Sequence, residues 1–133
     1  MTNTLKEKLN SRITPDDVIS AVIYATLRSE IPKNNSFLHK TVYTLKNEFP
    51  NIFSDFLFDG SGISPFSEDL DGVLFRLETA CILSTTNPSY SIYIVNRDCG
   101  ELQSSYDKLC RAGMAGELHA CAVRLCSFID SWD

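Results

Sequence analysis

The sequence predicts a mostly helical α+β fold, a single domain over residues 1–133 that contains one β-hairpin and ends in two C-terminal helices. The chain has 133 residues, 44% of them hydrophobic, and a chain of this size can bury roughly two-thirds of its unfolded surface in one core. Apolar residues recur at helical spacing in several segments. One pair of β-branched and aromatic runs flanks a turn-forming tetrad, which indicates the hairpin.

The first predicted helix starts at residue 15 and packs at the centre of the fold. Thr14 offers a hydroxyl cap, Pro15 suits the first turn, and two acids follow at the positive end of the helix dipole. The body of this helix is apolar around much of its circumference, which is typical of a centrally packed helix: Val18, Ile19, Val22, Ile23, Ala25 and Leu27. Pro32 and the asparagines at 34–35 are expected to end it.

Two further helices and a short strand are predicted next. Ser36 is the expected cap of the second helix, and Pro50 is its stop. Residues 54–59 contain an aromatic run that is typical of a short strand. Ser67 is the expected cap of the third helix. The apolar stripes of these helices consist of Leu38, Val42, Leu45 and Phe49 in the second, and Leu70, Val73, Leu74 and Leu77 in the third.

The hairpin and the last two helices follow. Residues 81–85 and 90–95 are the two hairpin strands, joined by a turn at 86–89. Asn96 is the expected cap of the fourth helix, which the glycine-containing stretch 113–116 ends. The last helix is predicted over residues 117–132, where its apolar stripe keeps the helical period for four turns.

This order of elements is that of a winged helix-turn-helix variant, with a winged-helix-like core at 15–96 and a helical extension at 97–133. Within the second helix, residues 38–45 read L-x-K-x-V-Y-x-L, and residues 64–77 combine a Ser-Pro-Phe-Ser turn with an acidic helix. Both patterns resemble Panacea-type antitoxin domains and related small prokaryotic winged-helix proteins. The resemblance implies a regulatory or toxin-neutralising interaction module.

Charge is unevenly distributed along the chain and disfavours DNA binding at the usual place. Residues 1–48 carry a net charge of +2, and residues 49–133 carry −7. The predicted third helix holds Glu68, Asp69, Asp71 and Glu78 against Arg76 alone, and the hairpin turn carries no charge. DNA-reading winged helices use basic or amide side chains at both places. An alternative DNA-binding transcriptional regulator would therefore have to use the second helix and its surroundings: Lys33, His39, Lys40 and Lys46.

A protein partner is the leading prediction. The acidic residues of the third helix form one candidate surface. The last helix forms the other, since Phe128, Ile129 and Trp132 place a large apolar area close to residue 133. That helix either folds back over the first helix and the hairpin or packs against a partner, which a two-fold homodimer would satisfy.

The sequence favours no enzyme, cofactor or metal. His119, Cys121 and Cys126, with Cys110 nearby, are the one Cys/His concentration, and core packing explains it better than zinc. Glu68 and Asp71 share a helix face, but carboxylates in a first turn are already favoured by the helix dipole. Five cysteines without paired spacing and a polar N-terminus predict a cytoplasmic protein without disulfides. No apolar run is long enough to span a membrane.

Overall fold

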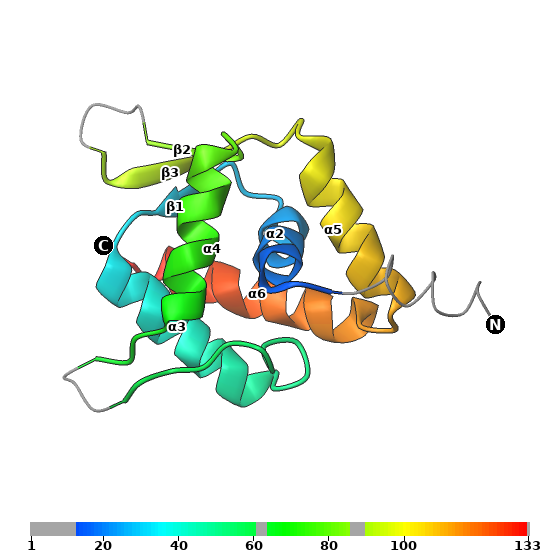
Figure 1. Ribbon diagram of the computed structural model, residues 1–133, viewed down its shortest axis with the longest axis horizontal. Coiled ribbons are helices and arrows are strands. Elements are labelled where there is room, and N and C mark those ends of the chain that lie inside the picture. Colours follow the sequence, from blue (N-terminus) through cyan, green and yellow to red (C-terminus); the bar gives the residue numbers. More distant parts are fainter. Residues whose placement is uncertain (1–12, 61–63, 86–89, 133) are drawn as a thin grey trace.

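The computed structural model describes residues 13–60, 64–85 and 90–132. It is mostly helical, with five helices and three short strands in this part of the chain (Figure 1). In chain order these are α2 (Pro15–Thr26), β1 (Glu30–Pro32), α3 (Asn35–Glu48), α4 (Glu68–Thr79), β2 (Leu83–Ser84), β3 (Ile92–Val95), α5 (Gly100–Arg111) and α6 (Ala115–Asp130).

Helix α2 lies at the centre and contacts α4, α5 and α6 (Figure 1). The prediction of its start is confirmed, since the Thr14 side chain accepts a hydrogen bond from the backbone of Asp17, whose carboxylate accepts one from the Thr14 backbone. Its central position is confirmed as well, because all six residues from Val18 to Ile23 are buried. One cluster of buried side chains joins α2 to every other helix and to the sheet.

The three strands form one antiparallel sheet in the order β1-β3-β2. β3 pairs with β1 through Glu30↔Ile94, Ile31↔Tyr93 and Pro32↔Ile92. It pairs with β2 through Leu83↔Val95 and Ser84↔Ile94, so the two predicted hairpin runs do pair. The predicted turn at 86–89 lies outside the described residues. Ile31, Tyr93 and Val95 are buried on the face of the sheet that meets the core.

The predicted end of the first helix is wrong. The helix stops at Thr26 because Leu27 takes a left-handed conformation and its N–H returns to the Tyr24 carbonyl. The Arg97 guanidinium then donates to the carbonyls of Ile23, Tyr24 and Arg28, which closes the helix end. The chain is thereby free to form β1, a strand that the sequence pattern does not predict.

The predicted strand at 54–59 is also wrong. Residues 50–55 form turns instead, with the N–H groups of Ile52 and Phe53 bonded to the Phe49 carbonyl. Ile52, Phe53 and Phe56 enter the core, a spacing that does not alternate as a strand requires. The Lys46 ammonium donates to the Phe56 carbonyl. An isolated bridge between Asp59 and Phe66 is the only strand-like pairing of the described part of this loop.

The caps of two helices differ from the prediction. Asn34, not Ser36, caps α3, because its side-chain oxygen accepts from the Phe37 N–H at 2.9 Å. α5 begins at Gly100 after a turn at 96–99, so Asn96 does not cap it. The prediction that Ser67 caps α4 is confirmed by its bond from the Leu70 N–H. α6 runs two residues ahead of the predicted range at each end.

Asp17 ties α2 to α5 through a carboxylate with several donors. Lys108 Nζ lies 2.9 Å from one oxygen and Ser105 Oγ lies 2.8 Å from the other. Burial alone would raise the pKa of Asp17, but hydrogen bonds from the Thr14 N–H, Lys108 and Ser105 outweigh it and hold the pKa below 3.8. A carboxylate whose folded pKa is lowered stabilises the protein above its unfolded pKa, and this contribution disappears as the pH falls through the folded pKa.

Replacing Asp17 by Asn is therefore expected to lower the free energy of unfolding by about 1–2 kcal/mol at pH 7. The difference between wild type and Asp17→Asn is expected to shrink as the pH falls below about 4, the ordinary pKa of an aspartate, and the wild-type carboxylate gains its proton. Urea unfolding at a series of pH values measures both quantities. A difference that stays constant down to pH ~2 would contradict this account of Asp17.

Cys81 begins the turn from α4 into β2 with a φ of 62°, in the left-handed region. In this region, steric repulsion of the Cβ atom destabilises a residue by about 1–2 kcal/mol, and glycine is free of this repulsion because it has no Cβ. Because Cys81 is exposed, its thiol contributes little packing. The substitution Cys81→Gly is expected to raise the free energy of unfolding by about 0.5–1 kcal/mol, after the greater backbone entropy of glycine is deducted.

The matched control is Cys81→Ala, which removes the thiol and keeps the Cβ. It is expected to leave the stability unchanged in the same denaturation experiment. Equal stabilisation by both substitutions would mean that the thiol, and not the backbone conformation, is unfavourable.

Candidate functional site

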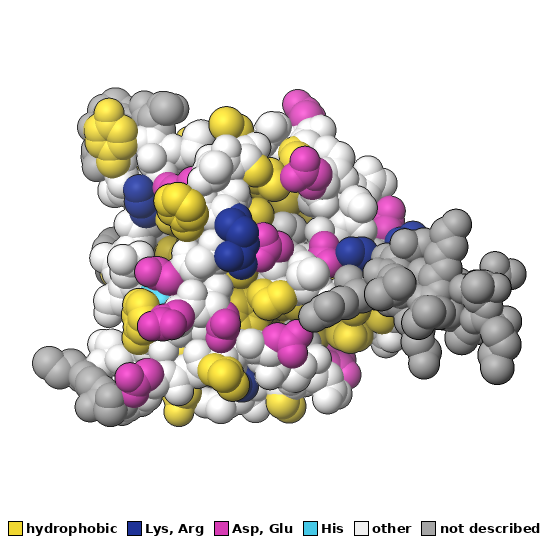
Figure 2. Space-filling view, in the orientation of Figure 1, with side chains coloured by type: hydrophobic (Ala, Val, Ile, Leu, Met, Phe, Trp, Pro, Cys, Tyr) yellow, Lys and Arg dark blue, Asp and Glu magenta, His cyan; other side chains and the backbone are white. Residues whose placement is uncertain are grey.

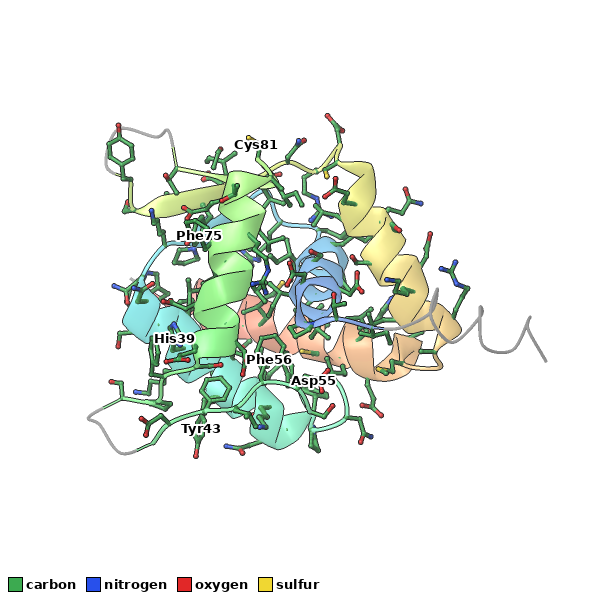
Figure 3. The ribbon with its side chains drawn as sticks, in the orientation of Figure 1. His39, Tyr43, Asp55, Phe56, Phe75 and Cys81 are labelled. Carbon is green, nitrogen blue, oxygen red and sulfur yellow. The ribbon has the colours of Figure 1, made fainter. Side chains whose placement is uncertain are left out.

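Helix α4 buries one side in the core and exposes the opposite side. Leu70, Val73, Leu74 and Leu77 are buried as the sequence predicts. The exposed side, here called the α4 outer face, consists of Glu68, Asp71, Phe75, Arg76 and Thr79. Figure 3 shows Phe75 on the side of α4 that faces away from α2, and the side chain is 68% exposed. A phenylalanine this exposed in the middle of a helix needs an explanation that packing within the chain does not give.

The four predicted acidic residues all belong to α4, on its outer face or beside it. His39 Nε2 lies 3.3 Å from a carboxylate oxygen of Asp71. Asp69 accepts from the Leu57 N–H at 2.9 Å, and Glu78 forms an ion pair with Lys33 at 3.5 Å. Glu68 is exposed at the first position of the helix. Most of these carboxylates are therefore anchored by a neighbour while remaining partly open to solvent.

Tyr93 of β3 lies near α4, and the carboxylates of this helix affect its pKa. Burial raises the pKa of Tyr93 to about 12, and the carboxylates of Glu78 and Asp71 add to the rise. Lys33 Nζ lies 5.5 Å from the centre of the ring. The phenol therefore stays neutral at physiological pH, and the nearby carboxylates of α4 disfavour its ionisation.

A hollow of about 350 Å³ lies where the loop before α4 meets the first turn of the helix. It is called the loop hollow here, and its described lining consists of Leu57, Phe58, Asp59, Phe66, Glu68 and Asp69. Leu57 and Phe66 are both exposed. In Figure 2, hydrophobic and acidic side chains lie near one another over α4 and the loop that precedes it, together with a basic side chain over α4.

The four candidate nucleic-acid residues do not form a basic face. His39 was expected on the outer side of the second helix, but it is only 3% exposed and packs against α4. Its Nδ1 accepts from the Ser67 N–H at 3.0 Å, which fixes the start of α4. Lys33 pairs with Glu78, and Lys46 donates to the Phe56 carbonyl. Among these four residues, Lys40 is the one that is exposed.

The apolar residues at the end of the chain contact other parts of it without being buried, and Trp132 remains 42% exposed. α6 contacts α2, α3 and α5, and the Trp132 ring lies 4.7 Å from that of Phe37. Arg124 lies over the Phe128 ring at 4.5 Å, and Ile129 is half-buried. Of the arrangement in which this helix folds back over the first helix and the hairpin, the structure shows the part in which it lies against the first helix. A homodimer through it stays a prediction.

The Cys/His concentration divides in the fold: Cys110 and His119 both contact the Tyr106 side chain, whereas Cys126 lies against Arg28. Cys121 is fully buried, and burial raises the pKa of its thiol to about 12, the Glu48 carboxylate adding to the rise. Cys126 accepts from Arg28 Nε, whereas His119 bonds to the Tyr106 hydroxyl on another part of the surface. All five thiols are free. Within residues 13–60, 64–85 and 90–132, no three His, Cys, Asp or Glu side chains form a group that could hold a metal ion.

Sequence reasoning missed the aromatic part of this site. Because a helix turns by about 100° per residue, Phe75 lies roughly opposite the apolar stripe of its helix. The helical period alone therefore predicts that Phe75 lies on the polar face. No comparable signal exists for Phe66 and Leu57. Their exposure depends on the loop conformation that replaces the predicted strand.

None of the helices in the described ranges has both the length and the apolar content needed to cross a membrane. No protein-family model, curated protein or solved structure gives a significant match to this chain.

Proposed function

We propose that this chain is a non-enzymatic, winged-helix-like interaction module of the cytoplasm that binds a protein partner through the α4 outer face. The fold assignment is supported by the order of the elements. A helix, a strand, two helices and an antiparallel strand pair follow one another, and the first strand lies beside the last. Five free thiols suit a reducing compartment.

The observation that carries the proposal is the exposed Phe75 among carboxylates on α4. In a winged-helix-like arrangement α4 is the helix that would enter the major groove of DNA. Phosphate neutralisation by Lys and Arg supplies most of the non-specific affinity of DNA-binding proteins. α4 carries four carboxylates and one guanidinium, and Arg76 is already paired with Asp16 at 2.7 Å. An exposed aromatic residue framed by acids favours a protein surface instead.

The role suggested by the resemblance to Panacea-type antitoxin domains is to neutralise a toxin or to serve in defence. The features of the chain that support this role are the motif in residues 38–45 and the acidic helix of residues 64–77. The DNA-binding alternative has less support, because three of its four candidate residues are buried or paired within the chain.

Affinity purification of the tagged full chain from its native host at low salt tests the proposal. Wild type is expected to retain a stoichiometric protein with a normal 260/280 nm absorbance ratio. Phe75→Ala is expected to lose that protein, because truncation of a central aromatic contact typically weakens binding by at least about 30-fold.

The matched control is Val123→Ala, which truncates a side chain of α6 that is 71% exposed. This variant is expected to retain the partner. Two results would overturn the proposal. One is nucleic acid in the eluate that is shed as the salt concentration rises, and the other is a partner that Phe75→Ala retains as well as wild type does.

A further inference from the structure

The loop hollow combines an aromatic ring with carboxylates in a way that the overall acidity of the chain does not explain. The backbones of Asp59 and Phe66 hold its two walls together through hydrogen bonds of 2.7 and 3.1 Å. The apolar part of the lining comes from Leu57, Phe58 and Phe66, and the acidic part from Asp59, Glu68 and Asp69. Both kinds of surface are therefore present within one concavity of the protein surface.

The Phe66 ring is held from one side and open on the other. On one side it stacks on His39, with ring centres 4.7 Å apart and an interplanar angle of 15°. His39 is itself fixed by the Ser67 N–H and by Asp71. The Phe66 side chain remains 43% exposed, so an aromatic face is presented to solvent without the entropy cost of ordering the ring. A cation placed over such a face is attracted by the negative potential of the ring.

The carboxylates around the ring add to this attraction. Asp69 uses one oxygen for the Leu57 N–H and keeps capacity for a further donor, because an ionised carboxylate offers about four acceptor positions. Glu68 is exposed at the start of α4. The helix N-terminus carries only about half a positive charge, whereas Glu68 and Asp69 place two carboxylates beside the ring. The hollow as a whole therefore favours a cation.

We infer that the loop hollow receives an arginine side chain of the protein partner. The inference rests on the proposed function and names the chemistry of the partner at one end of the same surface. A guanidinium is planar, stacks on aromatic rings and binds carboxylates through paired N–H donors. The exposed Leu57 provides apolar contact for the aliphatic stem. A phosphate-bearing ligand would be repelled by the same carboxylates.

The spacing along α4 specifies the partner further. Glu68 at the hollow and the exposed Phe75 are seven residues apart, which is about 10 Å along the helix axis. The partner segment therefore presents an arginine and an apolar side chain about 10 Å apart. This separation corresponds to residues i and i+7 on one face of a helix.

The test is an NMR titration of the ¹⁵N-labelled full chain with acetyl-arginine-amide. Saturable shifts are expected in the millimolar range at the amides of Leu57, Phe66, Glu68 and Asp69. Acetyl-citrulline-amide, which has the same shape without the charge, is expected to cause none, and acetyl-lysine-amide is expected to bind more weakly. Equal shifts with arginine and citrulline, equal affinity for lysine, or no shifts at all would overturn the inference.

Charge-neutral variants locate the binding. The double substitution Glu68→Gln and Asp69→Asn keeps an acceptor for the Leu57 N–H and is expected to weaken arginine binding by at least about fivefold. The control Glu101→Gln removes an exposed carboxylate on α5 and is expected to leave the affinity unchanged. An equal loss of arginine affinity in both variants would mean that only the net charge of the protein attracts arginine. That result would contradict specific binding in the loop hollow.

Failure of this inference is distinguishable from failure of the proposed function. One result would be that wild type captures a partner through Phe75 while arginine does not bind the loop hollow. In that case the α4 outer face is the binding surface, and the inference about arginine is wrong. If capture does not depend on Phe75 and arginine does not bind the loop hollow, both are wrong.

Discussion

Truncation of Phe56 to alanine is expected to lower the free energy of unfolding by about 3–5 kcal/mol. Phe56, which is labelled in Figure 3, is fully buried, and its ring makes an edge contact with the ring of Phe53 at 5.8 Å. It fixes the loop of residues 50–60, because Lys46 bonds to its carbonyl and no regular strand pairing holds this segment. Loss of the ring would leave a cavity where the loop meets the core. The same loop supplies Leu57, so the loop hollow depends on this anchor.

The neighbouring residue provides a matched control. Leu57 is 72% exposed, and Leu57→Ala is expected to change the stability by less than about 0.5 kcal/mol. Urea denaturation of both variants gives the two free energies. Similar losses for Phe56→Ala and Leu57→Ala would contradict the placement of this loop.

Replacing Arg97 by alanine is expected to cost about 2–4 kcal/mol. Its guanidinium donates to the carbonyls of Ile23, Tyr24 and Arg28 at 2.8–3.2 Å and lies 5.2 Å from the Tyr24 ring. α2 has no basic residue in its own last turn, so Arg97 supplies the cation that the negative end of the helix dipole favours. Without it, partly buried carbonyl groups at the centre of the fold would lose their donor.

The comparison with two other variants separates charge from geometry. Arg97→Lys keeps the charge but not the forked donors, and it is expected to recover less than half of the loss. Arg111→Ala removes the same side chain from an exposed position on α5 and is expected to be nearly neutral. Denaturation midpoints that fall equally for Arg97→Ala and Arg111→Ala would show that only the overall charge matters.

Local signals in the sequence predict the helices and the two hairpin strands, but they miss β1 and wrongly suggest a strand at residues 54–59. The Ser67 cap and the stripe from Leu70 to Leu77 lie within one segment of the chain, so periodicity identifies α4. β1 has only three residues, and its partner β3 begins sixty residues later at Ile92. A strand this short has no alternation to recognise. The end of α2 depends in the same way on Arg97, which no local pattern connects to that helix.

The acidic part of the candidate site and the outward position of Phe75 could be predicted, but the exposure of Phe66 and Leu57 could not. Carboxylates in the first turn of α4 are visible in the sequence because their positions follow from the helix. His39 was misplaced because a histidine beside Lys40 resembles a solvent-facing residue. Its burial follows from the loop that brings Ser67 against it. The aromatic run of residues 56–58 satisfies strand propensity, yet tertiary packing of Phe56 overrides that preference.

The measurement that tests the central claim most directly is photo-crosslinking from the α4 outer face. Phe75 is replaced by p-benzoylphenylalanine in the full chain, and Val123 of α6, similarly exposed, is replaced in a parallel variant. After irradiation in the native host, a discrete protein adduct is expected from position 75 and not from position 123. Adducts with nucleic acid at position 75, or the same protein adducts from both positions, would contradict the claim that the α4 outer face binds a protein partner.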